Sequence, residues 1–319
     1  MKHSTVALLV STVALSASVF AQNTTLRTPW GHPDLQGIWT NATLTPLQRP
    51  KELAGKEFFT PEEATKFERE RLEQGNLDRA PRRPGDVGAY NDLFFERGKI
   101  VKSRRTSLII EPADGMIPPL TPDAQHKVDA RRARADLHPA DSPEDRWLTE
   151  RCLLFGATIP MFPEPYNNNY RIMQTPDSVV ILVEMNHEAR MIPLDNRPHV
   201  GRSIRQWTGD SRGRWEGDTL VVETTNLKFN EQSRFGVMYL EGISDENLRV
   251  VERFSRTDAG TLTYRARIED PTVFVRPWTI EMSLTRSQGP LFEVACHEGN
   301  YGMQFILSGH RAEDRARAK

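Results

Sequence analysis

Through most of residues 170–298 apolar side chains recur at every second position, and this pattern constrains the fold more than any other feature of the sequence. Gly, Pro, Asn and Asp interrupt the pattern at intervals. Such alternation predicts half-buried antiparallel strands joined by turns. About eight consecutive strands would leave exposed edges in a flat sheet, and closure into a barrel removes those edges. We therefore expect a mainly β fold, an antiparallel up-and-down barrel that can hold one small ligand.

The predicted strands share this alternation and end at turn residues. They lie near residues 171–175, 179–186, 190–194, 219–225, 248–256, 261–268, 279–286 and 292–297. In contrast, the segment from Gly209 to Gly213 is rich in Gly, Asp and Ser. We interpret that segment as a loop at the mouth of the barrel.

The amino-terminal residues have the features of an export signal. Lys2 and His3 give a short basic start, residues 6–20 are largely apolar, and Ala21 completes a small-residue cleavage site. This order is typical of a signal peptide over residues 1–21, with an uncleaved signal-anchor as the alternative. Since no later segment is long and apolar enough to span a membrane, we expect a periplasmic or secreted protein.

The charge balance limits the class of partner. The chain has 42 basic and 43 acidic residues, which gives a formal net charge of −1. Nucleic-acid binding requires a clustered basic excess, and the charged residues here are mixed in sign. We therefore expect a small molecule, and no nucleic acid, as the partner.

The chain contains two cysteines, Cys152 and Cys296. In an oxidising compartment an even number of cysteines favours a disulfide. One bridge would close a loop of roughly 145 residues, which the chain-entropy model values at about 5 kcal/mol. The alternative is a pair of buried thiols. Two cysteines alone do not make a structural zinc site.

Residues 22–165 are rich in proline and contain three helix starts of one kind. A hydroxyl residue stands directly before a proline at Thr60, Thr121 and Ser142. The hydroxyl can cap a free backbone N–H, and proline suits the first helical position. We expect these helices to end near residues 74, 136 and 152.

The chain is expected to form one domain, because its front half has too few apolar residues for a core of its own. Residues 22–165 would then wrap on a barrel formed by residues 166–311. A polar tail at residues 312–319 would follow the barrel.

The tripeptide Gly37-Ile38-Trp39 resembles the start of the first strand in lipocalins. In that family the tryptophan closes one end of the barrel, and an arginine stacks across its ring. The resemblance implies that Trp39 closes the barrel here, with Arg286 or Arg311 as its partner.

Glu252 occupies the inward register of its predicted strand, between the apolar Val250 and Phe254. A carboxylate in such surroundings is costly unless it is paired or hydrogen-bonded. Two interpretations stay open. Glu252 lies in an apolar ligand cavity with a few inward polar groups, or it forms a structural ion pair with an arginine such as Arg286.

Polar side chains are densest between residues 166 and 190. Histidine titrates near neutral pH, so His187 with a carboxylate partner could exchange a proton with a substrate, and Glu184 is a candidate for the carboxylate. His297, near the end of the last predicted strand, could take the same role. The catalytic candidates are therefore His187, His297, Glu184 and Glu252, although each histidine could equally be structural. The substrate-binding candidates are Asn169, Tyr170, Arg171, Arg190, Tyr264 and Glu298.

We expect no metal site. On a strand, Glu184 and His187 would point to opposite faces. The spacing of the other histidines, including His199, matches no metal-binding motif.

Four motifs resemble those of an uncharacterised family of exported bacterial proteins with a lipocalin-like back half. They are PDLQGIW at 33–39, YNNNY at 166–170, RWEGDTLVVET at 214–224 and CHEGNY at 296–301. The resemblance implies a fold and an exported location. It implies no reaction and no catalytic residues.

Two functional hypotheses follow from these observations. The first is a cofactor-independent enzyme, a lyase, isomerase or hydrolase, that applies acid–base chemistry to a small, partly apolar organic substrate. The alternative is a lipocalin-like carrier that binds its ligand without changing it, because a fold does not determine a function. A structural part in an envelope complex is a third, weaker interpretation.

Overall fold

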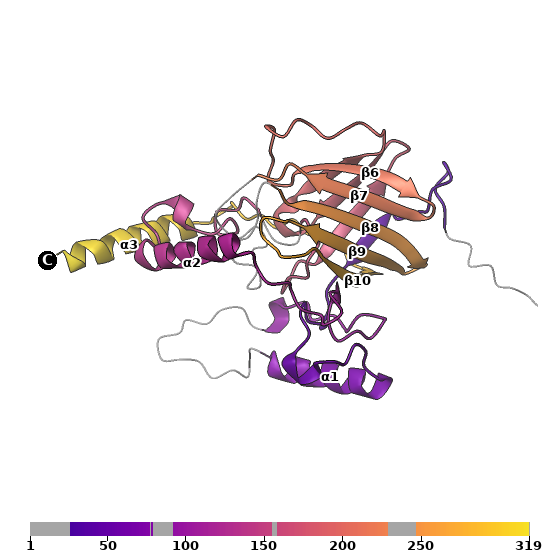
Figure 1. Cartoon of the computed structure of the whole chain (residues 1–319), viewed down its shortest axis with the longest axis horizontal. Helices are drawn as coiled ribbons and strands as arrows, with labels where there is room; N and C mark the ends of the chain where they lie inside the picture. The colour runs from indigo at the N-terminus through magenta and orange to yellow at the C-terminus, as the bar shows by residue number, and fades with distance from the viewer. Residues whose placement is uncertain (1–25, 77, 79–91, 155–157, 229–246, 319) are drawn as a thin grey trace, which may run out of the picture.

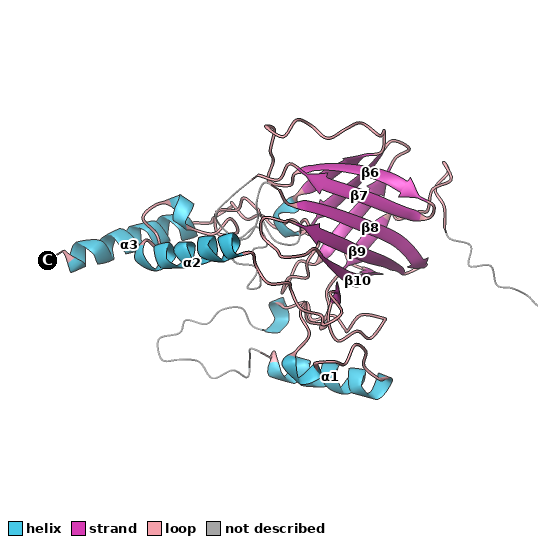
Figure 2. Ribbon diagram, in the orientation of Figure 1, coloured by secondary structure: helices cyan, strands magenta, loops and turns pink. Residues whose placement is uncertain are grey.

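The protein folds into a nearly closed antiparallel β-barrel of nine strands, with its helices outside the barrel (Figures 1 and 2). The computed structural model describes residues 26–76, 78, 92–154, 158–228 and 247–318. The proposed signal peptide at residues 1–21 lies outside the described residues. Neighbouring strands follow the order β5-β4-β3-β1-β10-β9-β8-β7-β6, and β2 pairs separately with β10. The prediction of a lipocalin-like barrel is confirmed.

The elements fall into two groups along the chain, with most of the strands in the second half. The strands are β1 Gly37–Thr40, β2 Ile109–Glu111, β3 Asn169–Gln174, β4 Ser178–Val183, β5 Ala189–Pro193, β6 Asp210–Glu216, β7 Thr219–Thr225, β8 Arg249–Asp258, β9 Thr261–Glu269 and β10 Trp278–Arg286. The helices are α1 Pro61–Gln74, α2 Pro122–Leu137 and α3 Gly302–Arg317, with short 3-10 turns that include η4 Pro143–Asp145 and η5 Met185–His187.

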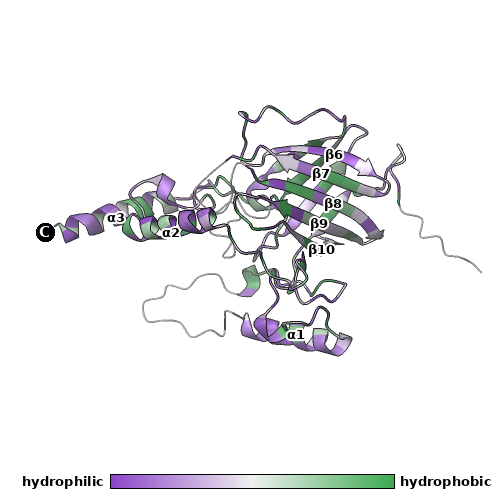
Figure 3. Ribbon diagram, in the orientation of Figure 1, coloured by the Kyte–Doolittle hydropathy of each residue, from purple (hydrophilic) through white to green (hydrophobic). Residues whose placement is uncertain are grey.

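Burial along the strands follows the alternation in the sequence. In β4 the buried residues are Val179, Ile181 and Val183, and the residues between them are partly exposed. Figure 3 shows hydrophobic and hydrophilic residues interleaved along the strands. One face of each strand therefore packs into the barrel, because side chains on a strand point to opposite faces in turn.

The barrel closes by packing at one seam, between β5 and β6. The described residues form no hydrogen-bonded ladder between these two strands. A Cβ atom placed on Gly213 of β6 would lie 2.8 Å from Ile192 Cγ2 of β5 and 2.7 Å from Leu194 Cδ2. The absence of a side chain at Gly213 thus lets the two edge strands approach, and apolar contact takes the place of hydrogen bonds there.

Strand β1 comes from the front half of the chain and lies between β3 and β10. Its Trp39 is fully buried and donates Nε1–H to Leu35 O at 2.9 Å. The guanidinium of Arg286 lies 5.6 Å from the Trp39 ring centroid, and that of Arg256 lies 5.5 Å from it. The implied arginine partner is confirmed for Arg286, and Arg256 provides a second cation over the ring.

Gly37 is required where β1 begins. Its φ is +138°, a region that side chains disfavour. An added Cβ would also lie 3.2 Å from Nη1 of Arg286. The glycine therefore leaves room for the arginine that covers Trp39.

The first two helix starts are confirmed. Thr60 accepts from Glu63 N and completes a capping box at α1, and Thr121 accepts from Ala124 N at α2. The third prediction is wrong, because only the 3-10 turn η4 follows Ser142. Cys152 has a φ of +52°, which a right-handed helix does not permit.

Three other parts of the chain differ from the sequence-based expectation. Residues 292–297 form no strand, and Phe292 N donates to the side chain of Glu184 instead of to a neighbouring strand. The segment 209–213 was expected to be a loop, but its residues 210–213 form the first part of β6 and pair with β7. Residues 302–317 form helix α3, in a region assigned in part to the barrel and in part to a polar tail.

The disulfide between Cys152 and Cys296 is confirmed, with a Cα–Cα distance of 5.8 Å. It joins the chain just before β3 to the chain just after β10. Within the described residues, no helix is both long enough and apolar enough to cross a bilayer.

Candidate functional site

A buried ion pair lies inside the barrel, between Arg190 of β5 and Glu252 of β8. Arg190 donates Nη1–H to Glu252 Oε1 at 3.1 Å and Nη2–H to Oε2 at 2.5 Å. The two side chains are 1% and 0% exposed. The inward register of Glu252 is confirmed, and the partner of this carboxylate is Arg190 instead of Arg286. Because β5 and β8 lie on opposite sides of the seam, the pair links the two edges from within.

Hydroxyl groups surround this pair. Tyr264 of β9 donates its hydroxyl proton to Glu252 Oε1 at 2.8 Å. Ser211 Oγ lies 3.5 Å from Arg190 Nη2 and 2.8 Å from Thr224 Oγ1. Burial first, and then the charge of Glu252, raise the pKa of Tyr264 far above its ordinary value. Tyr264 therefore remains a neutral hydrogen-bond donor, as a buried phenol beside a carboxylate must.

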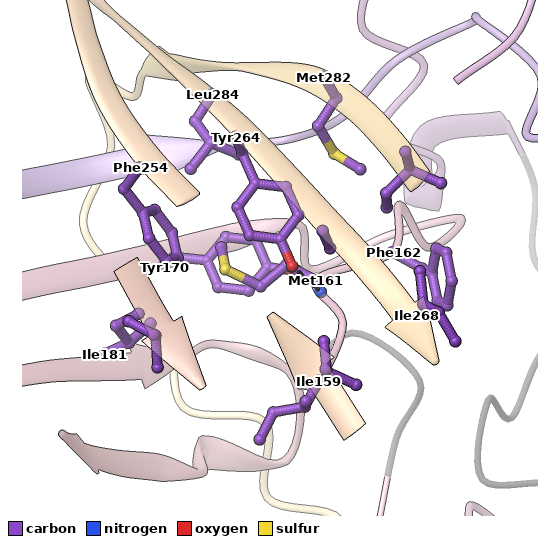
Figure 4. Packing of buried hydrophobic residues seen from close by; sticks show 14 of the residues in the cluster. Ile159, Met161, Phe162, Tyr170, Ile181, Phe254, Tyr264, Ile268, Met282 and Leu284 are labelled. Carbon is purple, nitrogen blue, oxygen red and sulfur yellow. Dashed lines mark hydrogen bonds between the residues drawn. The ribbon is translucent and has the colours of Figure 1, made fainter. Parts of the chain in front are cut away.

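The segment 158–162, just before β3, enters the barrel and completes this polar cluster. Arg190 donates to Thr158 O at 3.2 Å, and Met161 N donates to the hydroxyl oxygen of Tyr264 at 2.9 Å. Figure 4 shows Met161 gathered with the rings of Tyr264 and Tyr170 in the interior. Backbone groups of this segment therefore provide hydrogen-bond partners for the polar side chains inside the barrel.

Asn41 extends the network towards one end of the barrel. Its Nδ2 donates to Met161 O at 2.9 Å and to the hydroxyl oxygen of Tyr170 at 3.1 Å. Its Oδ1 is buried and has no hydrogen-bond partner among the described residues. The contact with a carbonyl oxygen fixes the orientation of the amide, because only the NH₂ group can donate to it. Asn41 thus presents an unused acceptor.

Glu164 is a second polar group with unused hydrogen-bonding capacity. Among the described residues its carboxyl group makes no hydrogen bond or ion pair, although its backbone N–H is bound by Asn168 Oδ1 at 2.7 Å. Burial raises the pKa of this carboxyl group to about 8. Burial and, second, the charge of Glu164 raise the pKa of Tyr170 above its ordinary value.

The middle of the barrel is filled. The side chains of Tyr170, Glu252, Phe254 and Tyr264 have no exposed surface, so no water-sized gap touches them. The open lumen expected from the sequence is occupied at this level by side chains and by the segment 158–162. The β-barrel remains compatible with binding a small molecule, and the groups available for it lie at the end that contains Asn41 and Glu164.

The structure joins Glu184 to Asn169 but does not join it to the predicted histidines. The buried carboxylate of Glu184 accepts from Asn169 Nδ2 at 2.7 Å and from Phe292 N at 3.0 Å. His187 and His297 are exposed and make no side-chain hydrogen bond among the described contacts. Arg171 and Glu298 are exposed as well.

A histidine with a carboxylate partner does occur beside the seam, at His199. Its Nδ1 lies 2.7 Å from Asp210 Oδ2, and its Nε2 lies 3.4 Å from Glu223 Oε1. Arg212 and Arg249 neutralise these two carboxylates. Since both ring nitrogens face carboxylates, His199 holds the loop before β6 in place.

Asn41 and Glu164 were missed as site residues from the sequence. Glu164 stands between Pro163 and Pro165 in an otherwise apolar segment directly before the YNNNY motif. An acid in such surroundings could have been selected as a buried carboxyl group. Asn41 follows the Gly-x-Trp strand and carries no signal of its own.

A comparison with models of known protein families finds no match to this chain. A search of curated proteins finds no match either.

Proposed function

We propose that this protein is an exported β-barrel that binds a small, partly apolar organic molecule at the barrel end formed by Asn41, Tyr170 and Glu164. One observation carries the proposal. Two polar groups, the buried Asn41 Oδ1 and the partly buried Glu164 carboxyl group, have no partner among the described residues. Buried polar groups are nearly always hydrogen-bonded, so unused capacity of this kind suggests a missing ligand.

The chemistry that suits this end is acid–base catalysis without a cofactor. A carboxyl group with a pKa of about 8 is protonated at neutral pH and exchanges its proton readily there. Glu164 would then act as the acid or base, while Tyr170 and Asn41 stabilise developing negative charge on the substrate. The reaction class would be that of a lyase, isomerase or hydrolase. The earlier assignment of His187, His297 and Glu184 to catalysis stays a prediction.

A carrier without catalytic activity is the second candidate. The filled interior and the ion pair between Arg190 and Glu252 favour it, because these two buried charges bind each other in the part of the barrel that the structure describes. Recovery of an unaltered small molecule from the purified protein would support the carrier. Conversion of a bound molecule, lost in Glu164→Gln, would support the enzyme.

Membership of the family of exported proteins with PDLQGIW and YNNNY motifs is part of the proposal. The periplasm or the extracellular space is the proposed location. The disulfide is compatible with it, because such bonds persist in oxidising compartments.

Binding at this end can be tested with 2-naphthol, which has an apolar double ring and one hydroxyl group. We expect the hydroxyl to donate to Asn41 Oδ1 and to accept from the protonated Glu164, so Glu164→Ala should weaken binding about tenfold. Fluorescence titration at pH 6.5 measures the affinity. Glu293→Ala, at an exposed position, is the matched control and should bind as the wild type does. Equal affinity in Glu164→Ala would contradict the proposed site.

The raised pKa of Glu164 predicts a pH-dependent stability. Between the ordinary value of 4.5 and about 8 the unfolded chain has lost this proton and the folded chain keeps it. Stability contributed by the neutral group is therefore complete below pH 4.5 and lost as the pH rises to about 8. Relative to the wild type, Glu164→Gln should gain about 1–3 kcal/mol in unfolding free energy between pH 4.5 and 8. Urea unfolding at several pH values measures this gain, and parallel curves would contradict it.

A further inference from the structure

Helix α3 contacts the loop that follows α2 through a cluster of histidine and aspartate side chains. Figure 1 shows α2 and α3 extending together, away from the barrel. Nε2 of His310 in α3 lies 3.1 Å from Oδ1 of Asp141 in that loop. Asp314, one turn further along α3, places Oδ2 3.6 Å from the same Nε2. His310 is only 9% exposed, so its ring is held firmly.

The cluster has the chemistry of a metal site. Asp141, His310 and Asp314 each offer one ligand atom, and these atoms lie within 4.8 Å of one another. It is the one group of three or more such ligands found in the described part of the chain. With zinc-to-ligand distances of about 2.0–2.1 Å, neighbouring ligand atoms of a tetrahedral site are about 3.3 Å apart. The distances of 3.1 Å and 3.6 Å lie on either side of that value.

A hydrogen bond from His310 can serve only one of the two carboxylates. Two carboxylates converge on Nε2 of His310, and that nitrogen carries at most one proton. The proton can serve Asp141 at 3.1 Å, but Asp314 at 3.6 Å is beyond hydrogen-bonding distance. Its only other ion pair in the described contacts is with the exposed Arg317 at 3.8 Å. A divalent cation between the three groups would bind both carboxylates and the ring nitrogen at once.

Asp141 is also positioned by a second histidine. Its other oxygen, Oδ2, lies 2.7 Å from Nδ1 of His138, which leaves Oδ1 directed at His310. Hydrogen bonds of this kind orient carboxylate ligands and strengthen metal binding. A ligand carboxylate held by a neighbour is therefore present before any ion arrives.

We propose that Asp141, His310 and Asp314 bind one divalent transition-metal ion of the zinc class, with water completing its coordination. One imidazole with two carboxylates suits zinc or a similar ion better than calcium or magnesium, which prefer oxygen ligands alone. The ion fixes α3 against the loop after α2. The spacing of ligands along the sequence could not reveal this site, because Asp141 and His310 are 169 positions apart.

The test uses the full chain, stripped of metal and titrated with ZnCl₂ by calorimetry at pH 7.5 in a non-chelating buffer. We expect one zinc ion per chain, at least tenfold weaker binding in Asp314→Asn, and loss of the site in His310→Ala. A rise of the thermal midpoint on adding zinc should occur in the wild type and be reduced in both variants.

The Asp314→Asn variant and a control variant make the zinc titration interpretable even if His310→Ala does not fold. Asp314 is exposed and asparagine has the same shape, so Asp314→Asn should fold even if His310→Ala does not. His126→Ala, at an exposed position of α2, is the matched control and should bind zinc as the wild type does. The proposal is overturned if the wild type binds no zinc, or if Asp314→Asn and His310→Ala bind it as tightly as the wild type.

Discussion

Replacing Arg190 by methionine is expected to lower the free energy of unfolding by about 3–5 kcal/mol. The change would leave the Glu252 carboxylate inside the barrel without its bidentate partner, at a position with no exposed surface. The hydroxyl of Tyr264 would be the one remaining donor to that carboxylate among the described contacts. An uncompensated buried charge is among the most destabilising changes that a single substitution can make.

Urea or thermal unfolding of the purified variant measures this loss. Arg171→Met, on the exposed face of the nearby strand β3, is the matched control and should change stability by less than about 1 kcal/mol. The double variant Arg190→Met/Glu252→Leu should recover much of the loss, because it removes both charges. A loss in Arg190→Met no greater than that in Arg171→Met would show that the pair does not stabilise the barrel.

Removing the disulfide with Cys152→Ser/Cys296→Ser is expected to cost about 2–5 kcal/mol. The bridge joins the two ends of the chain segment that contains β3 to β10, a separation of 144 residues. It therefore restricts the unfolded chain over most of the barrel. It also anchors the chain before α3, so the helix should lose protection from proteolysis as well.

Thermal unfolding in oxidising buffer measures the effect of the disulfide, and the same measurement with dithiothreitol is the control. Under reducing conditions the wild type and the double serine variant should unfold at nearly the same temperature. In oxidising buffer the wild type should be the more stable of the two. Identical unfolding in oxidising buffer would contradict a stabilising role for this bond.

The barrel could be predicted because its strands carry their own signal. In β9 the inward residues Leu262, Tyr264, Ala266 and Ile268 are apolar or aromatic and the residues between them are polar or charged, so the sequence pattern and the burial agree. Strand β6 contains Ser211, Arg212 and Gly213 and has no such pattern. Its strand conformation depends on pairing with β7, and the sequence of β6 alone does not reveal this pairing. The segment 292–297 was predicted as a strand from its local pattern, but it pairs with no strand in the described part of the chain, and Phe292 N is bound by the side chain of Glu184.

The inward orientation of Glu252 could be predicted from the sequence, but the residue that pairs with it could not. The alternation around Glu252 placed this carboxylate inside the barrel. Its arginine depended on how the seam between β5 and β6 closes, which sets Arg190 opposite Glu252. Asn41 and Glu164 join the candidate site because the segment 158–162 packs inside the barrel. This packing is tertiary structure, which the local sequence does not show. A site built from two segments that are distant in the sequence cannot be recognised from the residue spacing within either segment.

The position of the segment 158–162 has a consequence for the cooperativity of unfolding. Its backbone is bound by Tyr264 of β9 and Arg190 of β5, so displacing the segment breaks hydrogen bonds to strands on both sides of the barrel. We therefore expect the segment and the barrel to unfold together in a single transition.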